Sequence, residues 1–230
     1  MSDRNAQAPG ALLRLGIVAV ALLACGCSNV RRDFGDFIGR ATDMVTGNTA
    51  SGNALKMEDP YFPDERRDGI NRLANRTFGR GDPYTTRYQQ IAQTDDNFMV
   101  RATAIRALNR SRDASATPIF VAGLDAKESM IRLESAKALA NVPDEAAVPK
   151  LLRIVADQNE ERDIRIAAAD ALKHYRKIEV ARALVNVLSG RDFAVAWQAR
   201  QSLRYITGRD LRYDEAAWLA LLSGADSPLS

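Results

Sequence analysis

Apolar residues recur along this chain at the spacing of an amphipathic helix. Within the stretch "DIRIAAADALKHY", Ile164, Ala168, Ala171 and Leu172 fall at positions i, i+4, i+7 and i+8, which places them on one helical face. An upstream stretch opens with Pro149, and proline is tolerated in the first helical turn because its missing N–H has no partner there. Alternation of period two is nowhere sustained, so the pattern predicts helices and no sheet.

The helical pattern returns at a nearly fixed interval. Leu108, Leu139, Leu172 and Leu203 are 31, 33 and 31 residues apart, and the neighbouring columns keep the same steps. Repeats of about 20 to 50 residues are typical of solenoids, in which each unit buries its apolar face only against its neighbours. We therefore expect each unit to hold two helices, with Leu139 and Leu172 buried between units.

The first and last units of a solenoid are expected to be atypical because they cap the stack. The segment "ERRDGINRL" from Glu65 is predicted to be the second helix of a degenerate first unit. A closing helix is predicted from Asp214 to Leu222, with Asp214 as its N-cap and Trp218 packed inward.

The repeated segment resembles the HEAT repeat, and more closely the short bacterial units of phycobilisome lyase-type proteins. The second helix of such units carries a "VR..A..AL" signature, which is similar to "VRATAIRAL" from Val100, "IRLESAKAL" from Ile131 and "IRIAAADAL" from Ile164. The resemblance implies an all-α, right-handed α-solenoid of about four to five HEAT-like helical hairpins. We assign the HEAT-like repeat domain to residues 58–225.

The resemblance also implies a role for the arginine of the signature. In HEAT families this arginine commonly pairs with an aspartate about six residues earlier, and the pairs form a ladder between units. A structural ladder is therefore the favoured interpretation, and anion binding is the alternative. The residues concerned are Arg101, Arg132 and Arg165 with Asp95, Asp125 and Asp157.

A candidate binding face follows from the same resemblance, since in this family the second helices line the concave face. The polar positions on that face lean basic but are mixed, which suits an acidic protein segment better than DNA. The alternative is a merely solvated face. The candidate partner-binding residues are Arg106, Arg110, Lys137, Asn141, Lys173, His174, Arg204 and Tyr205.

Composition narrows the possible chemistry. The net charge is only +3, from 32 basic and 29 acidic residues, so no nucleic-acid partner is predicted. His174 is the only histidine, and Cys25 and Cys27 are the only cysteines. Without companions for His174 we predict no metal site, no cofactor and no enzyme activity. Aromatic residues are 7% of the chain, and we expect few of them at the surface; this scarcity and the lack of other cysteines argue against a chromophore-binding role.

The N-terminus has the features of an export signal. Arg4 and Arg14 precede an apolar run of about ten residues, within the length typical of a secretory signal and too short to span a membrane. The following "LLACGCSN" resembles a bacterial lipobox. We therefore predict a lipoprotein signal peptide at 1–24 and lipidation of Cys25 (or Cys27). An ordinary cleaved signal is the alternative.

The remaining segments are assigned by composition. Residues 25–57 are rich in Gly, Asn, Thr and Ser and are predicted to be a lipidated flexible linker, and residues 226–230 a disordered tail. The predicted function is a scaffold or adaptor that binds a protein partner and is anchored by lipid in the cell membrane or outer membrane, facing the periplasm or exterior. The alternative is a lyase- or chaperone-like accessory protein that holds a client or chromophore.

Overall fold

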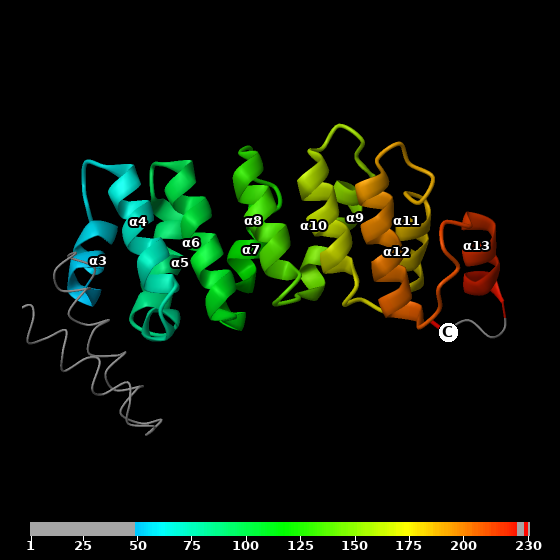
Figure 1. The fold of residues 1–230 in the computed structure, drawn as a ribbon, viewed down its shortest axis with the longest axis horizontal. Helices are drawn as coiled ribbons and strands as arrows, with labels where there is room; N and C mark the ends of the chain where they lie inside the picture. Colours follow the sequence, from blue (N-terminus) through cyan, green and yellow to red (C-terminus); the bar gives the residue numbers. More distant parts are fainter. Residues whose placement is uncertain (1–48, 225–227, 230) are drawn as a thin grey trace, which may run out of the picture. The chain divides into compact units, whose positions relative to one another are not determined.

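The computed structural model describes residues 49–224, 228 and 229. Within this part of the chain, the residues from Asn53 onward form one compact unit. The described residues form eleven α-helices and three short 3₁₀ helices, with no strand (Figure 1). The α-helices are α3 (Ala50–Met57), α4 (Pro63–Ala74), α5 (Tyr84–Thr94), α6 (Phe98–Ser111), α7 (Thr117–Gly123), α8 (Ser129–Leu139), α9 (Val148–Ala156), α10 (Arg162–Leu172), α11 (Ile178–Val185), α12 (Phe193–Thr207) and α13 (Glu215–Ser223).

Three 3₁₀ turns connect the helices. They are η1 (Thr77–Arg80), η2 (Ala114–Ala116) and η3 (Glu145–Ala147). The turns η2 and η3 each lead directly into a first helix that has proline at its N-terminus. Asp113 and Asp144 cap these two turns with hydrogen bonds to backbone N–H groups, so two successive units open with the same local structure.

The helices pair within units and stack between units, so the predicted all-α repeat fold is confirmed. The pairs are α5 with α6, α7 with α8, α9 with α10, and α11 with α12. The second helices α4, α6, α8, α10 and α12 each pack on the next, in the order in which they follow one another in Figure 1. The predicted second helix of a degenerate first unit is α4, which packs on α6.

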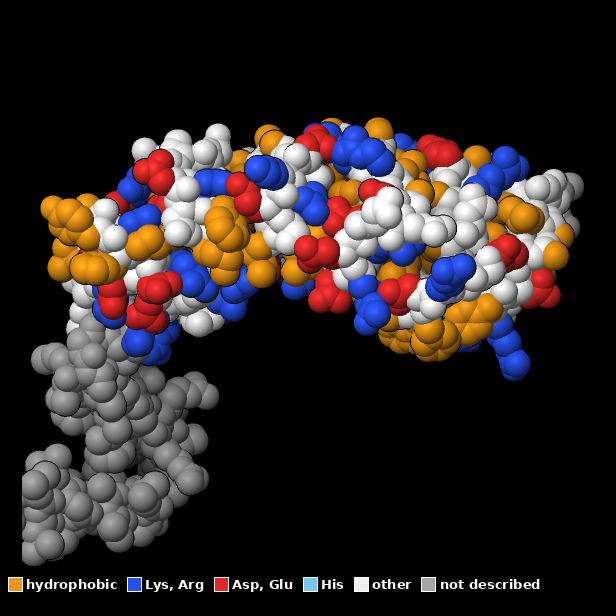
Figure 2. All heavy atoms as spheres, turned by 90° about the horizontal axis from the view of Figure 1, so that it is seen from above, with side chains coloured by type: hydrophobic (Ala, Val, Ile, Leu, Met, Phe, Trp, Pro, Cys, Tyr) orange, Lys and Arg blue, Asp and Glu red, His pale blue; other side chains and the backbone are white. Residues whose placement is uncertain are grey.

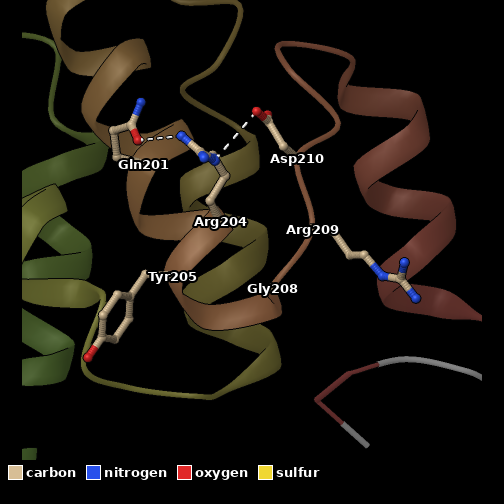
Figure 3. A pocket seen from close by; sticks show the side chains of 6 residues that line it. All are labelled: Gln201, Arg204, Tyr205, Gly208, Arg209 and Asp210. Carbon is tan, nitrogen blue, oxygen red and sulfur yellow. Dashed lines mark hydrogen bonds and ion pairs between the residues drawn. The ribbon is translucent and has the colours of Figure 1, made fainter.

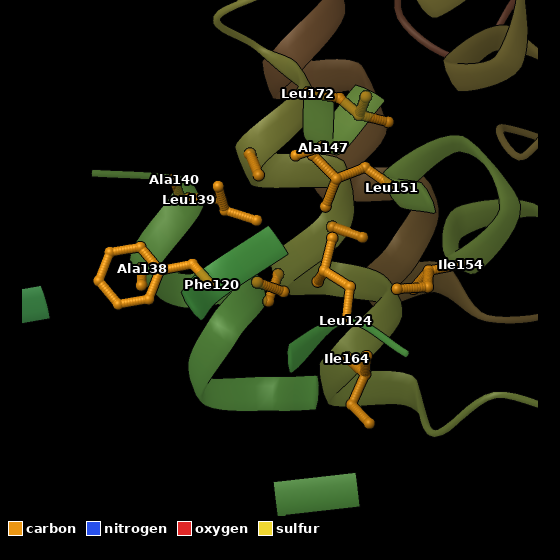
Figure 4. Packing of buried hydrophobic residues seen from close by; sticks show 14 of the residues in the cluster. Phe120, Leu124, Ala138, Leu139, Ala140, Ala147, Leu151, Ile154, Ile164 and Leu172 are labelled. Carbon is orange, nitrogen blue, oxygen red and sulfur yellow. The ribbon is translucent and has the colours of Figure 1, made fainter. Parts of the chain in front are cut away.

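The leucine column lies in the core of the stack. Leu108, Leu139, Leu172 and Leu203 are all fully buried, as the repeat predicts. Figure 4 shows the layer between α7 and α10, where buried side chains of successive helices, among them Leu151, meet. Each unit thus completes its core with residues of its neighbours.

Small residues allow the helices to approach closely. A Cβ atom at Gly123 of α7 would lie 2.1 Å from the Ser135 hydroxyl of α8, and one at Gly69 of α4 would lie 2.5 Å from the backbone nitrogen of Met57. Both distances are far below van der Waals contact; at Gly69 the clash is with backbone, so glycine is required there, whereas at Gly123 the Ser135 side chain would have to move. The second contact shows that α3 packs against α4.

One segment boundary differs from the sequence-based prediction. Residues 50–57, predicted to be linker, form α3, and its Asn53 and Met57 are buried. In the predicted disordered tail, the Pro228 carbonyl accepts a 3.1 Å hydrogen bond from Arg176. Packing of Asn53 and Met57 against the repeat orders α3 despite the polar composition of the segment. The predicted signal, lipidated cysteines and remaining linker lie outside the described residues.

The closing helix agrees with its prediction. Asp214 is the N-cap of α13 and accepts a 2.9 Å hydrogen bond from the Ala217 N–H. Trp218 is fully buried, and its indole Nε1 donates to the Arg212 carbonyl at 3.1 Å. The helix therefore covers the apolar end that α11 would otherwise expose.

Candidate interaction surface

The second helices carry the predicted site residues, and local caps fix where some of them begin. The Asn97 side chain accepts hydrogen bonds from two N–H groups at the start of α6, and Asp192 does the same at the start of α12. Such caps satisfy N–H groups that have no partner within the helix. They set the register in which side chains of successive second helices meet.

The predicted ladder exists, but its acidic partners were wrong. Arg101 does not bind the Asp95 carboxylate; its Nη1 donates to the Asp95 backbone carbonyl at 2.8 Å, and its Nη2 donates to Glu128 of the next unit at 3.2 Å. Arg132 likewise donates to the Ala126 carbonyl at 2.9 Å. It pairs with both carboxylate oxygens of Glu160, at 2.7 and 2.9 Å.

The Asp95 carboxylate instead binds an arginine of the preceding unit. Arg66 of α4 holds it through two hydrogen bonds of 2.9 and 3.0 Å. The other two predicted acids also have different partners. Asp125 pairs with Lys150 and Arg153, and the Asp157 side chain accepts from the Asn159 N–H.

At the third predicted position of the ladder, a different arginine forms the ion pair. Arg165 reaches only the Val155 carbonyl, at 3.1 and 3.3 Å. Arg162, three residues earlier, pairs with Asp192 of the next unit at 2.7 Å. We call the resulting set the arginine row: Arg66–Asp95, Arg101–Glu128, Arg132–Glu160 and Arg162–Asp192.

The arginine row perturbs the titration of its acids. The hydrogen bonds from Arg132 hold the pKa of Glu160 below its usual value, and those from Arg162 lower the pKa of Asp192. The row therefore consists of ion pairs that join consecutive units. It supports a structural role for these arginines.

A second set of contacts runs along the C-terminal ends of the second helices. Arg110 donates to the Asn75 side chain at 2.7 Å, and Asn141 donates to the Asn109 side chain at 2.8 Å. The His174 Nε2 lies 2.8 Å from the Ala140 carbonyl, and its ring is edge-on to that of Tyr205, with centroids 6.2 Å apart. We call these four contacts the variable row, because each uses different chemistry.

The variable row changes the interpretation of the predicted partner-binding residues. Arg110, Asn141 and His174 lie on the predicted face, but their polar groups already hold neighbouring units together. Lys173 pairs with Asp170 at 2.9 Å. Arg204 donates to Gln201 at 2.9 Å and lies 3.4 Å from Asp210 (Figure 3).

Arg106 and Lys137 share one buried acid. Glu134 of α8 is 3% exposed and accepts a 2.8 Å hydrogen bond from Arg106 of the preceding unit. Lys137 lies farther away, at 3.8 Å, and its side chain is 51% exposed. The hydrogen bond from Arg106 to Glu134 raises the pKa of Arg106. Arg106 thus serves the fold, whereas Lys137 remains available to a partner.

Two hollows lie along α8, α10 and α12. One, of about 410 Å³, is lined by Lys137, Asp163, Ile166, Ala167, Asp170 and Gln198. The other, of about 380 Å³, lies at the end of α12 and includes Tyr205 and Arg209 (Figure 3). Beside it, hydrogen bonds chiefly from Arg200 lower the pKa of Asp210 to about 2.

Sequence reasoning missed an apolar stripe on this face. Leu133, Ile166 and Trp197 occupy the same position of α8, α10 and α12, at the 33- and 31-residue steps of the repeat. The first two are partly exposed, and Trp197 is 46% exposed. One turn before Trp197, Phe193 is 68% exposed. The repeat spacing of Leu133, Ile166 and Trp197 in the sequence could have identified this stripe.

Despite the low aromatic content, many aromatic side chains of the described residues are exposed. Exposed large hydrophobic residues include seven aromatic ones, namely Tyr61, Phe62, Phe78, Phe98, Phe193, Trp197 and Tyr205. The expectation that few aromatic side chains reach the surface is wrong. Figure 2 shows hydrophobic side chains gathered at the α3 end of the described domain and again at the level of α12.

The described residues hold no group of three or more His, Cys, Asp or Glu side chains that could bind a metal ion. Among the same residues, none of the helices has the length and apolar character needed to cross a bilayer.

Comparison with known proteins agrees with the repeat. Residues 87–173 match the family model described as HEAT repeats. The X-ray structure of YibA from Escherichia coli is similar, with a TM-score of 0.58 at 19% identity, over 95% of this chain and 81% of that chain. Human deoxyhypusine hydroxylase in complex with glycerol has a TM-score of 0.47 at 16% identity, over 70% of this chain and 74% of that one. No curated protein sequence matches the chain significantly.

Proposed function

We propose that this protein is a non-enzymatic, membrane-anchored scaffold that binds a protein partner outside the cytoplasm. The proposal is supported by the match of residues 87–173 to HEAT repeats, since repeat solenoids present extended binding surfaces. The lipid anchor is Cys25 (or Cys27). The partner binds the second-helix face, which we define as the hollow beside Lys137 together with the apolar stripe Leu133, Ile166 and Trp197.

The observation that supports this face most is the exposure of Trp197. Its three repeat equivalents are smaller, and Ala102 among them is buried. A tryptophan that is nearly half exposed contributes little to the core of its own unit. Tryptophan is enriched among residues that carry most of the binding energy at protein interfaces. The stripe therefore fits the apolar side of a partner segment, with Lys137 beside it for an acidic group.

Site-specific photo-crosslinking tests the face. A crosslinker placed at Lys137 should give one adduct mass in cells, and Trp197→Ala in the same protein should remove that adduct. A crosslinker at Glu179, exposed on the first helix α11, is the matched control and should give none. Equal adducts at Glu179, or an adduct at Lys137 that survives Trp197→Ala, would show that the partner binds elsewhere.

The anchor is tested separately. Cys25→Ser together with Cys27→Ser should release the protein from the membrane fraction, and a palmitate analogue should label only the wild type. A double variant that still sediments with membranes contradicts the lipid anchor and leaves the crosslinking result unaffected.

An accessory protein that holds a client is the second candidate. The exposed Phe193 and Trp197 favour it, because an aromatic ridge can also hold a flexible or partly unfolded chain. The same crosslinks separate the two functions. A scaffold gives one adduct mass from Lys137, whereas a holder of clients gives many.

A further inference from the structure

The loop between α3 and α4 exposes apolar side chains in a fixed conformation. Tyr61 is 81% exposed and Phe62 is 63% exposed, and Leu55 of the preceding helix is 75% exposed. The two aromatic residues stand between Pro60 and Pro63, which restrict the backbone on both sides.

Hydrogen bonds hold this loop in place. The Asp59 Oδ1 accepts from the Tyr61 N–H at 2.8 Å and from the Phe62 N–H at 2.7 Å. Arg66, a member of the arginine row, donates to the Asp59 carbonyl at 2.9 Å. The loop is therefore tied to the repeat and loses little conformational entropy when it binds a surface.

Three acids beside the loop are paired with basic side chains, whereas the Asp59 carboxylate accepts from backbone N–H groups, which lower its pKa. Glu58 accepts from Arg87 at 2.6 Å, Asp64 pairs with Arg67 at 2.9 Å, and Glu65 pairs with Lys56 at 2.8 Å. Pairing reduces the repulsion that free carboxylates would feel from an anionic surface. The pairing of Glu58, Asp64 and Glu65 thus favours approach to a bilayer, and the charge of Asp59 opposes approach to a strongly anionic one.

Chain length places a lipid surface within reach of this end of the domain. Ala50, the first residue of α3, follows Cys25 by 25 residues, which span at most about 80–90 Å when fully extended. A tether of this kind gives the loop a high effective concentration at the membrane, so a weak affinity is sufficient. Phenylalanine and tyrosine partition into the interfacial region between water and acyl chains.

We propose that Tyr61, Phe62 and Leu55 form a membrane-contact surface that docks the α3–α4 end of the domain on the lipid bilayer. This inference rests on the proposed lipid anchor. Docking through these residues orients the repeat, because Phe193 and Trp197 lie on α12, at the other end of the described row of helices (Figure 1). The second-helix face then stays accessible to a partner.

The first experiment measures depth in the bilayer. The full lipidated chain is reconstituted in vesicles of phosphatidylethanolamine and phosphatidylglycerol in a Trp197→Phe background, which leaves only buried Trp218 as a constant signal. Quenching lipids should strongly reduce the fluorescence added by Tyr61→Trp. The matched control, Phe193→Trp, is a similarly exposed aromatic position and should not be quenched. Equal quenching at both positions, or none at Tyr61, would overturn the proposal even though the protein is anchored.

The second experiment removes the anchor. The full chain carrying Cys25→Ser and Cys27→Ser should still bind the same vesicles weakly. Adding Tyr61→Ser and Phe62→Ser should lower its partition coefficient ~10-fold, given the apolar area lost. A matched Phe78→Ser change, at another exposed aromatic, should leave the coefficient unchanged.

The two experiments separate the possible failures. If the cysteine variants show that the protein is not lipidated, the vesicle-binding difference still tests the loop. If partition is the same with and without Tyr61 and Phe62, the loop does not contact lipid. In that case a protein partner or another segment of the chain covers it.

Discussion

The arginine row and the variable row occupy opposite ends of the same second helices, and they solve the same problem differently. The arginine row joins four pairs of neighbouring units with one kind of contact, an arginine to a carboxylate. The variable row uses an arginine–amide pair, an amide–amide pair, a histidine–carbonyl contact and a ring contact. The repeat therefore brings neighbouring second helices into contact at both ends, but it keeps the same residue types in contact only in the arginine row.

Burial distinguishes the rows at Arg66–Asp95 and Arg132–Glu160, whereas Arg162 of the fourth pair is 68% exposed. The Arg132 and Glu160 side chains are 19% and 10% exposed, so both charges are removed from much of the solvent and need a partner. In the variable row, Arg110 and Asn141 are exposed, and water can replace a lost hydrogen bond. Residues can change at the exposed end at little cost, which leaves that end free to acquire binding residues such as Tyr205.

The largest expected effect comes from the core on which both rows depend. Leu172→Ala removes a fully buried side chain between units and should lower the free energy of unfolding by about 2–5 kcal/mol. Thermal unfolding followed by circular dichroism measures it. The control is Leu219→Ala, at a leucine that is 41% exposed, and it should change little. A melting temperature for Leu172→Ala that matches the wild type would contradict the repeat register.

The next effect concerns the buried acid between the two rows. Arg106→Ala leaves Glu134 buried with only the distant Lys137 and should cost about 2–4 kcal/mol. The double variant Arg106→Met with Glu134→Met should recover most of this loss, because an apolar pair needs no partner. Lys137→Ala is the control and should cost under about 1 kcal/mol. Chemical denaturation measures all three, and a double variant no more stable than Arg106→Ala would exclude this explanation.

That contact also corrects an expectation drawn from the sequence. Arg106 and Lys137 occupy the same column of the repeat, 31 residues apart, and both were predicted to bind a partner. The structure separates them, because a carboxylate at position 106 would face Glu134. Only Lys137 remains a clean probe of binding.

The fold could be predicted from the sequence because burial leaves a periodic trace. The column of Leu108 and Leu139 and the cap at Asp214 each follow from spacing or local chemistry. The partners of Arg101 and Arg132 could not be identified in this way. An aspartate lies at about the expected distance before each arginine, but the guanidinium reaches a backbone carbonyl there and a carboxylate 27 or 28 residues later.

Surface exposure was harder to predict than burial. Trp197 fits the helical period as well as a core residue does, and only packing shows that it faces solvent. Tyr61 and Phe62 lie outside any repeat column, so no periodic signal marks them. Their exposure depends on how Asp59 and Arg66 hold the loop.

Single deletions in the two rows compare them directly. Arg132→Ala removes two hydrogen bonds to Glu160 and two to backbone carbonyls, and should cost about 1.5–3 kcal/mol. Asn141→Ala removes an exposed amide contact and should cost about 0.5–1 kcal/mol. Urea unfolding of both variants beside the wild type gives the two values. Equal losses would mean that burial does not explain the difference between the rows.

The smallest expected effect is the pH dependence of the stability lost in Arg132→Ala compared with that lost in Asn141→Ala. Because Arg132 lowers the pKa of Glu160 in the folded protein, the pair stabilises the fold fully above the unfolded pKa of about 4.3. Its contribution is lost as the pH falls through the lower, folded pKa.

The stability gap between wild type and Arg132→Ala should therefore narrow from pH about 7 to pH about 3 and close further below that. The gap for Asn141→Ala should stay constant, because neither amide of that contact titrates. Urea unfolding at each pH measures both gaps. If the Arg132 gap is as large in acid as at neutral pH, the carbonyl contacts of Arg132 stabilise the fold and its ion pair with Glu160 does not. The arginine row would then resemble the variable row, with hydrogen bonds rather than charge joining its units.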